Sequence, residues 1–279
     1  MIHVNLLLTL CLSLVLLGCV SLSPQTRRLL DQPISPEKYM IKGLDNLSKD
    51  NGDCGPGALA MALNWSGKNV AIEDIKPKVL TPKKNGSLPS DMISTARHYG
   101  RLAVELNSLR GLVAELGAGT PVIALLNMGF DWLPVWHYVL VVGYDVNDQE
   151  FKVFSGGEAL ETMPFTYFER HWTLAKNWGL VLLPPNKLAN SIGELEHMRA
   201  ASSLESIGKL LAAKTAYQTI LKKWPHSFTA HVGLGNIAFQ EKDFAKAEFF
   251  LMKALQLKPR SKAAKHNLAI VRAQIESRS

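Results

Sequence analysis

Apolar positions divide the chain into two parts with different patterns. Up to Pro184-Pro185, segments with apolar residues at helical spacing alternate with short continuous apolar runs, which predict buried strands. Beyond these prolines the pattern is helical throughout. The helices expected in the first part are 54–64, 72–75, 91–99, 108–116 and 165–174, and the strands are 102–106, 121–126, 137–144, 150–154 and 178–183. Helices followed by an antiparallel sheet predict an α+β domain.

The helical part carries a weak repeat of 34 residues, the spacing between Pro225 and Pro259. With Pro259 as the last marked position of a tetratricopeptide repeat, the small and large sites fall on Leu234, Gly235, Ala238, Phe244, Ala247, Leu251 and Ala254. We expect an all-α module over 190–279, with tetratricopeptide repeats at about 194–227 and 228–261 and a capping helix. An ordinary helical hairpin is the alternative.

The N-terminus predicts export. An apolar run over 6–17 is too short to cross a bilayer but fits the core of a signal peptide. It leads into Gly18-Cys19, which resembles a bacterial lipobox, although no Lys or Arg precedes the run. We expect a lipoprotein signal peptide over 1–18, lipidation of Cys19 and a polar tether over 19–39. An uncleaved anchor and a plain signal peptide are the alternatives.

Composition and charge narrow the class of protein. With 279 residues, 47% of them hydrophobic, the chain can form one sizeable core and a smaller module. The net charge of +7 comes from 190–279, which holds 14 Lys and Arg against 7 Asp and Glu, while 20–189 holds 17 of each. Such an excess fits a solvated helical surface, an acidic partner or an anionic lipid surface. No nucleic-acid motif accompanies it, so nucleic acid is not expected as a partner.

Cys54 is the strongest candidate for chemistry. It lies in Asp53-Cys54-Gly55-Pro56, directly before a buried helical pattern. A thiol at a helix N-terminus lies among unpaired N–H groups and the positive end of the helix dipole, which lower its pKa. Cys11 would be lost with the signal peptide and Cys19 used for lipid, so Cys54 has no partner for a disulfide. A buried structural cysteine is the alternative.

His137 is the candidate base for Cys54. It begins an apolar strand and follows a segment rich in aromatic residues, in which Trp132 and Trp136 could line a substrate groove. A nucleophilic cysteine on a first helix and a histidine on a later strand follow the order of papain-like enzymes. A histidine at the rim of the core is the alternative. The other histidines show no metal-ligand spacing, so neither a metal nor a cofactor is expected.

Two motifs resemble the double-glycine (bacteriocin-processing) peptidase family. One is the motif around Cys54, and the other is His137-Tyr138-Val139 with the following Val142-Gly143-Tyr144-Asp145. The resemblance covers about 40–185 and is greatest to lipoprotein members that carry tetratricopeptide repeats. It implies a papain-like cysteine peptidase domain at 40–185, with Cys54 as nucleophile and His137 as general base and acid. The preference of transporter-fused members for a double glycine is not carried over.

The sequence departs from this family at two positions. The family has a glutamine five or six residues before the cysteine that stabilises the oxyanion, and here Ser48 and Lys49 stand there. Ser48, Lys49 and Asn51 are therefore the oxyanion candidates, beside the Cys54 backbone N–H. The residue that orients the histidine is expected to be an Asp on the next strand, where this chain has Ser155; Asp145 and Asp148 are placed less well.

The sequence thus predicts a lipid-anchored bacterial cysteine peptidase, facing the periplasm from the outer membrane. It would act on a peptide or protein substrate and bind a protein partner through its repeats. The alternative is a catalytically weakened scaffold of the cell envelope, which the two departures favour. Thiol acyl transfer would use the same pair of residues.

Overall fold

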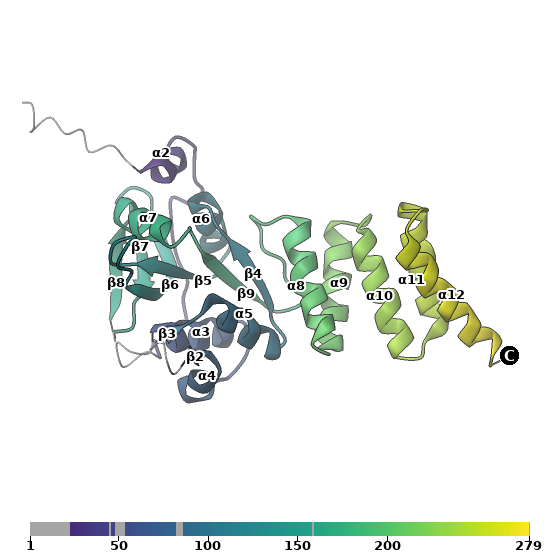
Figure 1. Ribbon diagram of the computed structural model, residues 1–279. Coiled ribbons are helices and arrows are strands. Elements are labelled where there is room, and N and C mark those ends of the chain that lie inside the picture. The colour runs from purple at the N-terminus through teal and green to yellow at the C-terminus, as the bar shows by residue number, and fades with distance from the viewer. Residues whose placement is uncertain (1–22, 45, 48–53, 82–85, 158, 279) are drawn as a thin grey trace, which may run out of the picture.

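The computed structural model describes residues 23–44, 46–47, 54–81, 86–157 and 159–278. It shows a sheet domain followed by a row of helices (Figure 1). The helices of the sheet domain are α2 (Pro24–Leu30), α3 (Cys54–Trp65), α4 (Ile72–Val79), α5 (Pro89–His98), α6 (Leu109–Gly117) and α7 (Phe165–Leu174). The helices of the row are α8 (Glu194–Ser206), α9 (Leu210–Lys223), α10 (Phe228–Gln240), α11 (Phe244–Leu257) and α12 (Lys262–Glu276).

One antiparallel sheet forms the centre of the first domain. Its strands run in the order β4-β9-β5-β6-β7-β8, and β1 pairs with the C-terminal half of β6. Their bounds are β1 (Lys38–Met40), β4 (Leu102–Leu106), β5 (Val122–Asn127), β6 (Trp136–Asp145), β7 (Glu150–Phe154), β8 (Leu160–Pro164) and β9 (Gly179–Leu183). A separate hairpin joins β2 (Leu80–Thr81) and β3 (Gly86–Ser87).

Both faces of the sheet are covered, which explains the continuous apolar runs in its central strands. Alternate residues along a strand point to opposite faces. In β5, Ile123 belongs to the hydrophobic cluster that contains α3, α4 and α5, whereas Val122 and Ala124 belong to the cluster that contains α6 and α7. The predicted α+β class is confirmed.

The row α8–α12 is built from antiparallel helices that pack on their neighbours in sequence (Figure 1). Polar side chains begin three of these helices by accepting a backbone N–H: Ser227 from Ala230, Asp243 from Lys246 and Ser261 from Ala264. The all-α character of this part is confirmed, while its assignment to tetratricopeptide repeats stays a prediction. No helix in the part of the chain that the structure describes is long and apolar enough to span a membrane.

The row also covers the edge of the sheet. Strand β4 is the last strand on its side, and α8 packs against it. A single hydrophobic cluster runs from Leu102 and Val104 in β4 to Met198 and Leu204 in α8, all of them buried. The helical row and the sheet domain therefore share one core.

The segment 19–39, expected to be a tether, is folded from Pro24 onward. Helix α2 buries Thr26 and Leu29 against the sheet domain. The buried Glu169 carboxylate accepts hydrogen bonds from the backbone N–H groups of Gln25 (2.8 Å) and Thr26 (2.6 Å) and from the Thr26 hydroxyl (2.7 Å). The polar residues that suggested a free linker in fact have partners in the fold. The predicted signal peptide and Cys19 lie outside the described residues.

Strand β8 is an element that the sequence did not predict. Only Met163 of its five residues is buried, so it lacks the apolar pattern of the central strands. It pairs with β7 at the outer edge of the sheet, where exposed polar side chains are tolerated. Such a strand is specified by its backbone pairing more than by its own composition.

Candidate active site

Cys54 is the first residue of α3, and the residues that follow it fix the helix end against the sheet. Gly55 to Leu63 are all buried. A Cβ on Gly55 would lie 2.5 Å from Ser87 Oγ and 3.3 Å from Tyr138 Cδ2, so only glycine allows this close approach to β3 and β6. The start of α3 is thereby held beside β6, and Cys54 itself is partly exposed.

His137 lies at the start of β6, where it pairs with Leu126 of β5 and is only partly buried. The side chains of Cys54 and His137, which are far apart in the sequence, lie close enough to each other for each to shift the pKa of the other. The other side of the imidazole is occupied by Ser155: His137 Nε2 lies 2.8 Å from Ser155 Oγ and 3.1 Å from the Ser155 carbonyl oxygen. This leaves Nδ1 as the ring nitrogen available to the Cys54 sulfur.

The surroundings of Cys54 favour the thiolate. Burial by itself raises the pKa of Cys54. Hydrogen bonds from His137 and from the backbone N–H groups of Tyr138 and Gly55, together with the charge on His137, outweigh burial and lower the pKa below that of an ordinary cysteine. The anion is thus stabilised by donors from both β6 and α3.

The surroundings of His137 favour the imidazolium. The hydrogen bond to Cys54 and the charge of its thiolate raise the pKa of His137, while burial opposes them. The Ser155 carbonyl adds to the rise by accepting the Nε2 proton. Because the pKa of the thiol falls and that of the imidazole rises, the pair can exist as thiolate and imidazolium over a window of pH.

Ser155 reaches His137 because β6 and β7 form a hairpin. Phe154, the last residue of β7, pairs with Leu140, and Ser155 follows at the level of the start of β6. Asp145 lies at the far end of β6, where its carboxylate accepts a hydrogen bond from Lys38 and backbone N–H groups of the turn. Neither Asp145 nor the exposed Asp148 contacts His137, so among the described residues Ser155 is the one that orients the imidazole.

Of the aromatic residues before His137, Phe130 and Trp132 lie in the turn 128–135 between β5 and β6, and Trp136 begins β6. Trp132 is 79% exposed and Trp136 53% exposed, and the ring of Phe130 stacks on that of Trp132 at 5.7 Å. They form an apolar surface next to the start of β6. Both predicted groove residues are thus exposed, and their role in a substrate groove stays a prediction.

Asn127, which sequence reasoning did not single out, holds this turn in place. Its buried side chain accepts hydrogen bonds from the backbone N–H groups of Gly129 (3.0 Å) and Val135 (2.9 Å) and donates one to the Phe130 carbonyl (3.1 Å). An asparagine that ends an apolar strand two residues before a glycine is the sequence signal that could have identified it.

The oxyanion candidates Ser48, Lys49 and Asn51 lie outside the described residues. Among those that are described, no group of three His, Cys, Asp or Glu side chains is placed to hold a metal ion.

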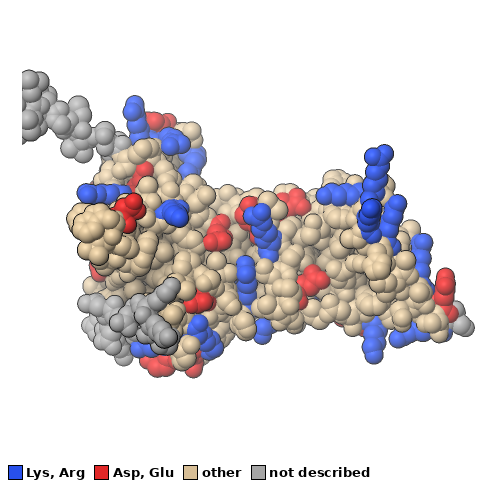
Figure 2. Space-filling model, in the orientation of Figure 1, with Lys and Arg blue, Asp and Glu red and all other residues tan. Residues whose placement is uncertain are grey.

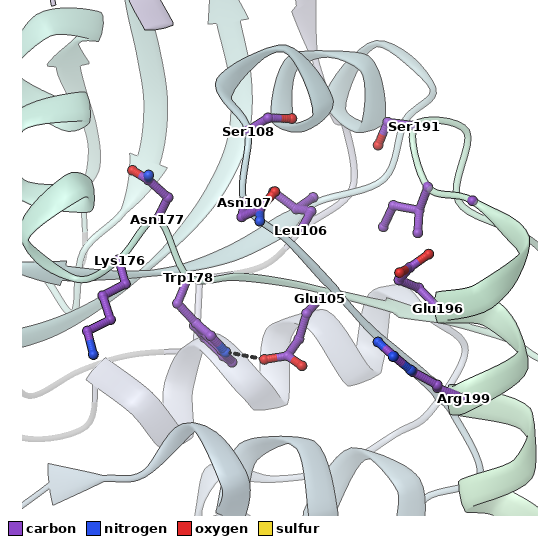
Figure 3. A pocket seen from close by; sticks show the side chains of 12 residues that line it. Glu105, Leu106, Asn107, Ser108, Lys176, Asn177, Trp178, Ser191, Glu196 and Arg199 are labelled. Atoms are coloured by element: carbon purple, nitrogen blue, oxygen red, sulfur yellow. Dashed lines mark hydrogen bonds between the residues drawn. The ribbon is translucent and has the colours of Figure 1, made fainter. Parts of the chain in front are cut away.

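A cavity of about 490 Å³ at the junction of the sheet domain and α8 is separate from this site (Figure 3). Glu105 from β4 and Arg199 from α8 lie on two of its sides, and Trp178 donates a hydrogen bond from its indole N–H to Glu105 (2.6 Å). Neither Cys54 nor His137 lines it. The Trp178 ring meets Tyr138 edge-on at 5.9 Å, which connects the cavity wall to the strand that carries His137.

Comparisons with known proteins assign this domain to a family. The family model described as Peptidase_C39 like family matches residues 41–179. No curated protein matches the chain.

Three peptidases are among the solved structures that are similar to the chain. The peptidase domain of Streptococcus ComA, a bifunctional ABC transporter involved in a quorum sensing pathway, is 17% identical (TM-score 0.39, covering 52% of this chain and 98% of that one). A double glycine motif protease from an AMS/PCAT transporter, in complex with the leader peptide, is 20% identical (TM-score 0.39, covering 54% and 96%). Xylellain, a cysteine protease from Xylella fastidiosa, is 15% identical (TM-score 0.41, covering 58% and 89%). The domain at residues 41–179 is thus a Peptidase_C39-like domain of the cysteine-peptidase type.

Proposed function

We propose that Cys54 and His137 hydrolyse peptide bonds, with Cys54 as nucleophile and His137 as general acid and base. The observation that carries this proposal is the proximity of Cys54 at the start of α3 to His137, whose Nε2 is held by Ser155 at 2.8 Å. A thiol with a lowered pKa next to a histidine with a raised pKa is the arrangement that activates sulfur for attack on a carbonyl carbon.

The reaction would proceed in two steps. The Cys54 thiolate attacks the carbonyl carbon, and the imidazolium gives its proton to the departing amine, which leaves a thioester. Neutral His137 then takes a proton from water as the water attacks the thioester; the carbon–sulfur bond breaks, the carboxylic acid is released, and Cys54 is restored as thiolate beside the imidazolium. The negative oxygen of each tetrahedral intermediate would lie near the N-terminus of α3, whose N–H groups have no partner within the helix.

The substrate would approach as an extended peptide along Trp132, in the turn between β5 and β6, and Trp136, the first residue of β6. Both indoles are exposed, so apolar side chains of a peptide can cover them. The hydrogen bonds of Asn127 keep this turn in one conformation. A rigid apolar surface next to the reacting atoms would position the peptide at low cost in entropy.

The rate at which Cys54 is alkylated tests the catalytic pair without a known substrate. At pH 6 a cysteine of ordinary pKa is almost entirely protonated, whereas the paired thiolate reacts with iodoacetamide. We expect alkylation of Cys54, located by mass spectrometry, to be at least tenfold faster in the native chain than in His137→Ala. Equal rates in the two chains would contradict the catalytic pair and favour the scaffold.

We further propose that Cys19 carries a lipid that anchors the protein to the outer membrane, facing the periplasm, and that α8–α12 bind a protein partner. A polar ladder supports the second role. Asn267 donates to Asn236 (2.9 Å), and Asn236 donates to Glu205 (3.3 Å), along a cavity of about 320 Å³ that also contains Phe239 and Ile270. Metabolic labelling with palmitate, lost in Cys19→Ala, tests the anchor.

A further inference from the structure

The two edges of the helical row differ in charge. Since neighbouring helices are antiparallel, the turns after α9 and α11 lie on one edge, and the turns after α8 and α10 lie on the other (Figure 1). The first pair of turns, 222–228 and 258–262, carries five basic residues and no acidic one, and we call it the basic edge: Lys222, Lys223, Lys258, Arg260 and Lys262. The second pair carries both signs.

The charges of the opposite edge are largely neutralised by neighbours. Lys214 pairs with Glu241 at 2.6 Å, and Lys246 pairs with Asp243 at 2.6 Å. In the part of the chain that the structure describes, no salt bridge joins a residue of the basic edge to a carboxylate, and all five of its cations are exposed. The excess charge of the chain is thus concentrated where no acidic side chain of the protein balances it.

Aromatic rings accompany the basic edge. The ammonium of Lys223 lies 4.7 Å from the ring centre of Trp224, and that of Lys258 lies 4.7 Å from the ring centre of Phe228. Trp224 and Phe228 are partly exposed. Rings with one side in the protein and one side near water, next to lysines, suit the headgroup level of a bilayer.

Helix α2 lies on the same side of the molecule as the basic edge (Figure 1), and Lys and Arg side chains cover both regions in Figure 2. Arg27 and Arg28 of α2 are exposed. The described chain begins at Ser23, immediately before α2, and only four residues, 20–23, lie between Cys19, the proposed site of the lipid, and the first residue of α2. They span at most about 15 Å, so such a lipid would hold α2 close to the bilayer.

From these observations we propose that the basic edge and α2 together form a surface that lies on an anionic phospholipid membrane. The location of this surface rests on the proposed lipid anchor, whereas its affinity for anionic lipid does not. Helix α3, which begins with Cys54, packs on the face of the sheet opposite to α6 and α2. A molecule lying on its basic edge would therefore turn Cys54 away from the lipid and towards peptides in solution.

Vesicle binding by residues 19–279 with Cys19→Ser tests the proposal, since this chain contains every described helix and strand and can carry no lipid at that position. The probes are vesicles of phosphatidylcholine with and without phosphatidylglycerol. We expect cosedimentation only with phosphatidylglycerol, and its loss when the salt concentration rises from 0.05 to 0.5 M, because salt screens exposed charges. Equal binding to both vesicles, or binding to neither, would overturn the proposal.

Neutral substitutions test which edge binds. We expect either of two double variants to lower the partition coefficient by roughly thirtyfold: Lys222→Gln with Lys223→Gln, or Lys258→Gln with Arg260→Gln. The reason is that each basic residue near an anionic surface contributes a similar free energy of binding. The matched control removes two charges from the other edge, with Lys209→Gln and Lys242→Gln, and leaves binding within about threefold. A control that weakens binding as much as the test pairs would show net charge acting without a defined surface. Since no substrate is involved, failure here and failure of the peptidase are separate results.

Discussion

At the scale of single residues, the site depends on the partners of the two ring nitrogens of His137. Nδ1 is left for Cys54, and Nε2 bonds to the hydroxyl and the carbonyl oxygen of Ser155. Both acceptors at Ser155 are uncharged, so they orient the ring but stabilise the imidazolium less than a carboxylate would. The width of the pH window in which the ion pair exists should therefore depend on the side chain at position 155.

We expect Ser155→Asp to widen that window at its alkaline end. A carboxylate within hydrogen-bond reach raises the pKa of His137 further above its ordinary value, so the imidazolium is lost at a pH about one unit higher. The alkaline limb of the alkylation rate of Cys54 against pH reports this loss. Ser155→Asn, which has the same size without the charge, is the control, and identical alkaline limbs for the Asp and Asn variants would contradict the role of Ser155.

The sequence names candidate residues for this site but not the geometry that brings them together. Cys54 and His137 stand out because a thiol before a helix and a histidine at the start of an apolar strand are local signals. That their side chains meet depends on Gly55, whose missing Cβ allows α3 to approach Ser87 and Tyr138. Asn127 acts through backbone groups of a turn, which no local pattern around His137 reveals.

At the scale of elements, the hydrophobic pattern predicts some helices and strands, whereas others form through hydrogen bonds to other parts of the fold and could not be predicted from it. Helix 165–174 was predicted with its bounds, because its buried positions, Phe165, Phe168 and Trp172, follow helical spacing. Strand β8 was missed because most of its residues are exposed and it is held by pairing with the neighbouring β7. Helix α2 was missed because the Glu169 carboxylate that binds its first residues is distant in sequence. In the helical row, Gly235 is one of the small positions of the predicted repeat. It lies against Leu251 and Ala247 of the next helix, where a larger side chain would not fit.

Gly233, two residues before Gly235 in α10, lies still closer to a neighbouring helix, where it contacts Tyr217 of α9. A Cβ there would lie 2.3 Å from Tyr217 Cε2 and 2.4 Å from Cζ. The ring cannot move freely, since the Tyr217 hydroxyl donates to Glu205 (2.6 Å). We expect Gly233→Ala to lower the free energy of unfolding by about 1–2 kcal/mol, because overpacking outweighs the better helix propensity of alanine.

Urea denaturation followed by circular dichroism measures this change. The control is Gly193→Ala, where the nearest contact of an added Cβ is the flexible Glu196 carboxylate at 3.5 Å. A Gly233→Ala chain as stable as the control would mean that α9 and α10 can separate slightly without loss.

At the scale of the whole molecule, the sheet domain and the helical row are less independent than the sequence suggests. The change of pattern at Pro184-Pro185 indicates a boundary between domains, yet the residues of β4 and α8 belong to one hydrophobic cluster. Such a shared core arises because β4 is an edge strand, and an uncovered edge strand is open to pairing with other chains. Hydrophobic pattern shows which residues are buried but not which element buries them.

Removal of the helical row should therefore damage the peptidase domain even though α8–α12 hold no residue of the Cys54 site. A chain that ends at residue 189 exposes Leu102 and Val104, which are at most 1% exposed in the intact molecule. We expect it to aggregate or to unfold at a lower temperature, as seen by size-exclusion chromatography and thermal denaturation. The matched control ends at Ser261 and removes only α12, which packs mainly on α11 and leaves β4 covered. If the two truncated chains retained the same melting temperature for the sheet domain, α8 would be a neighbour of β4 without contributing to its stability.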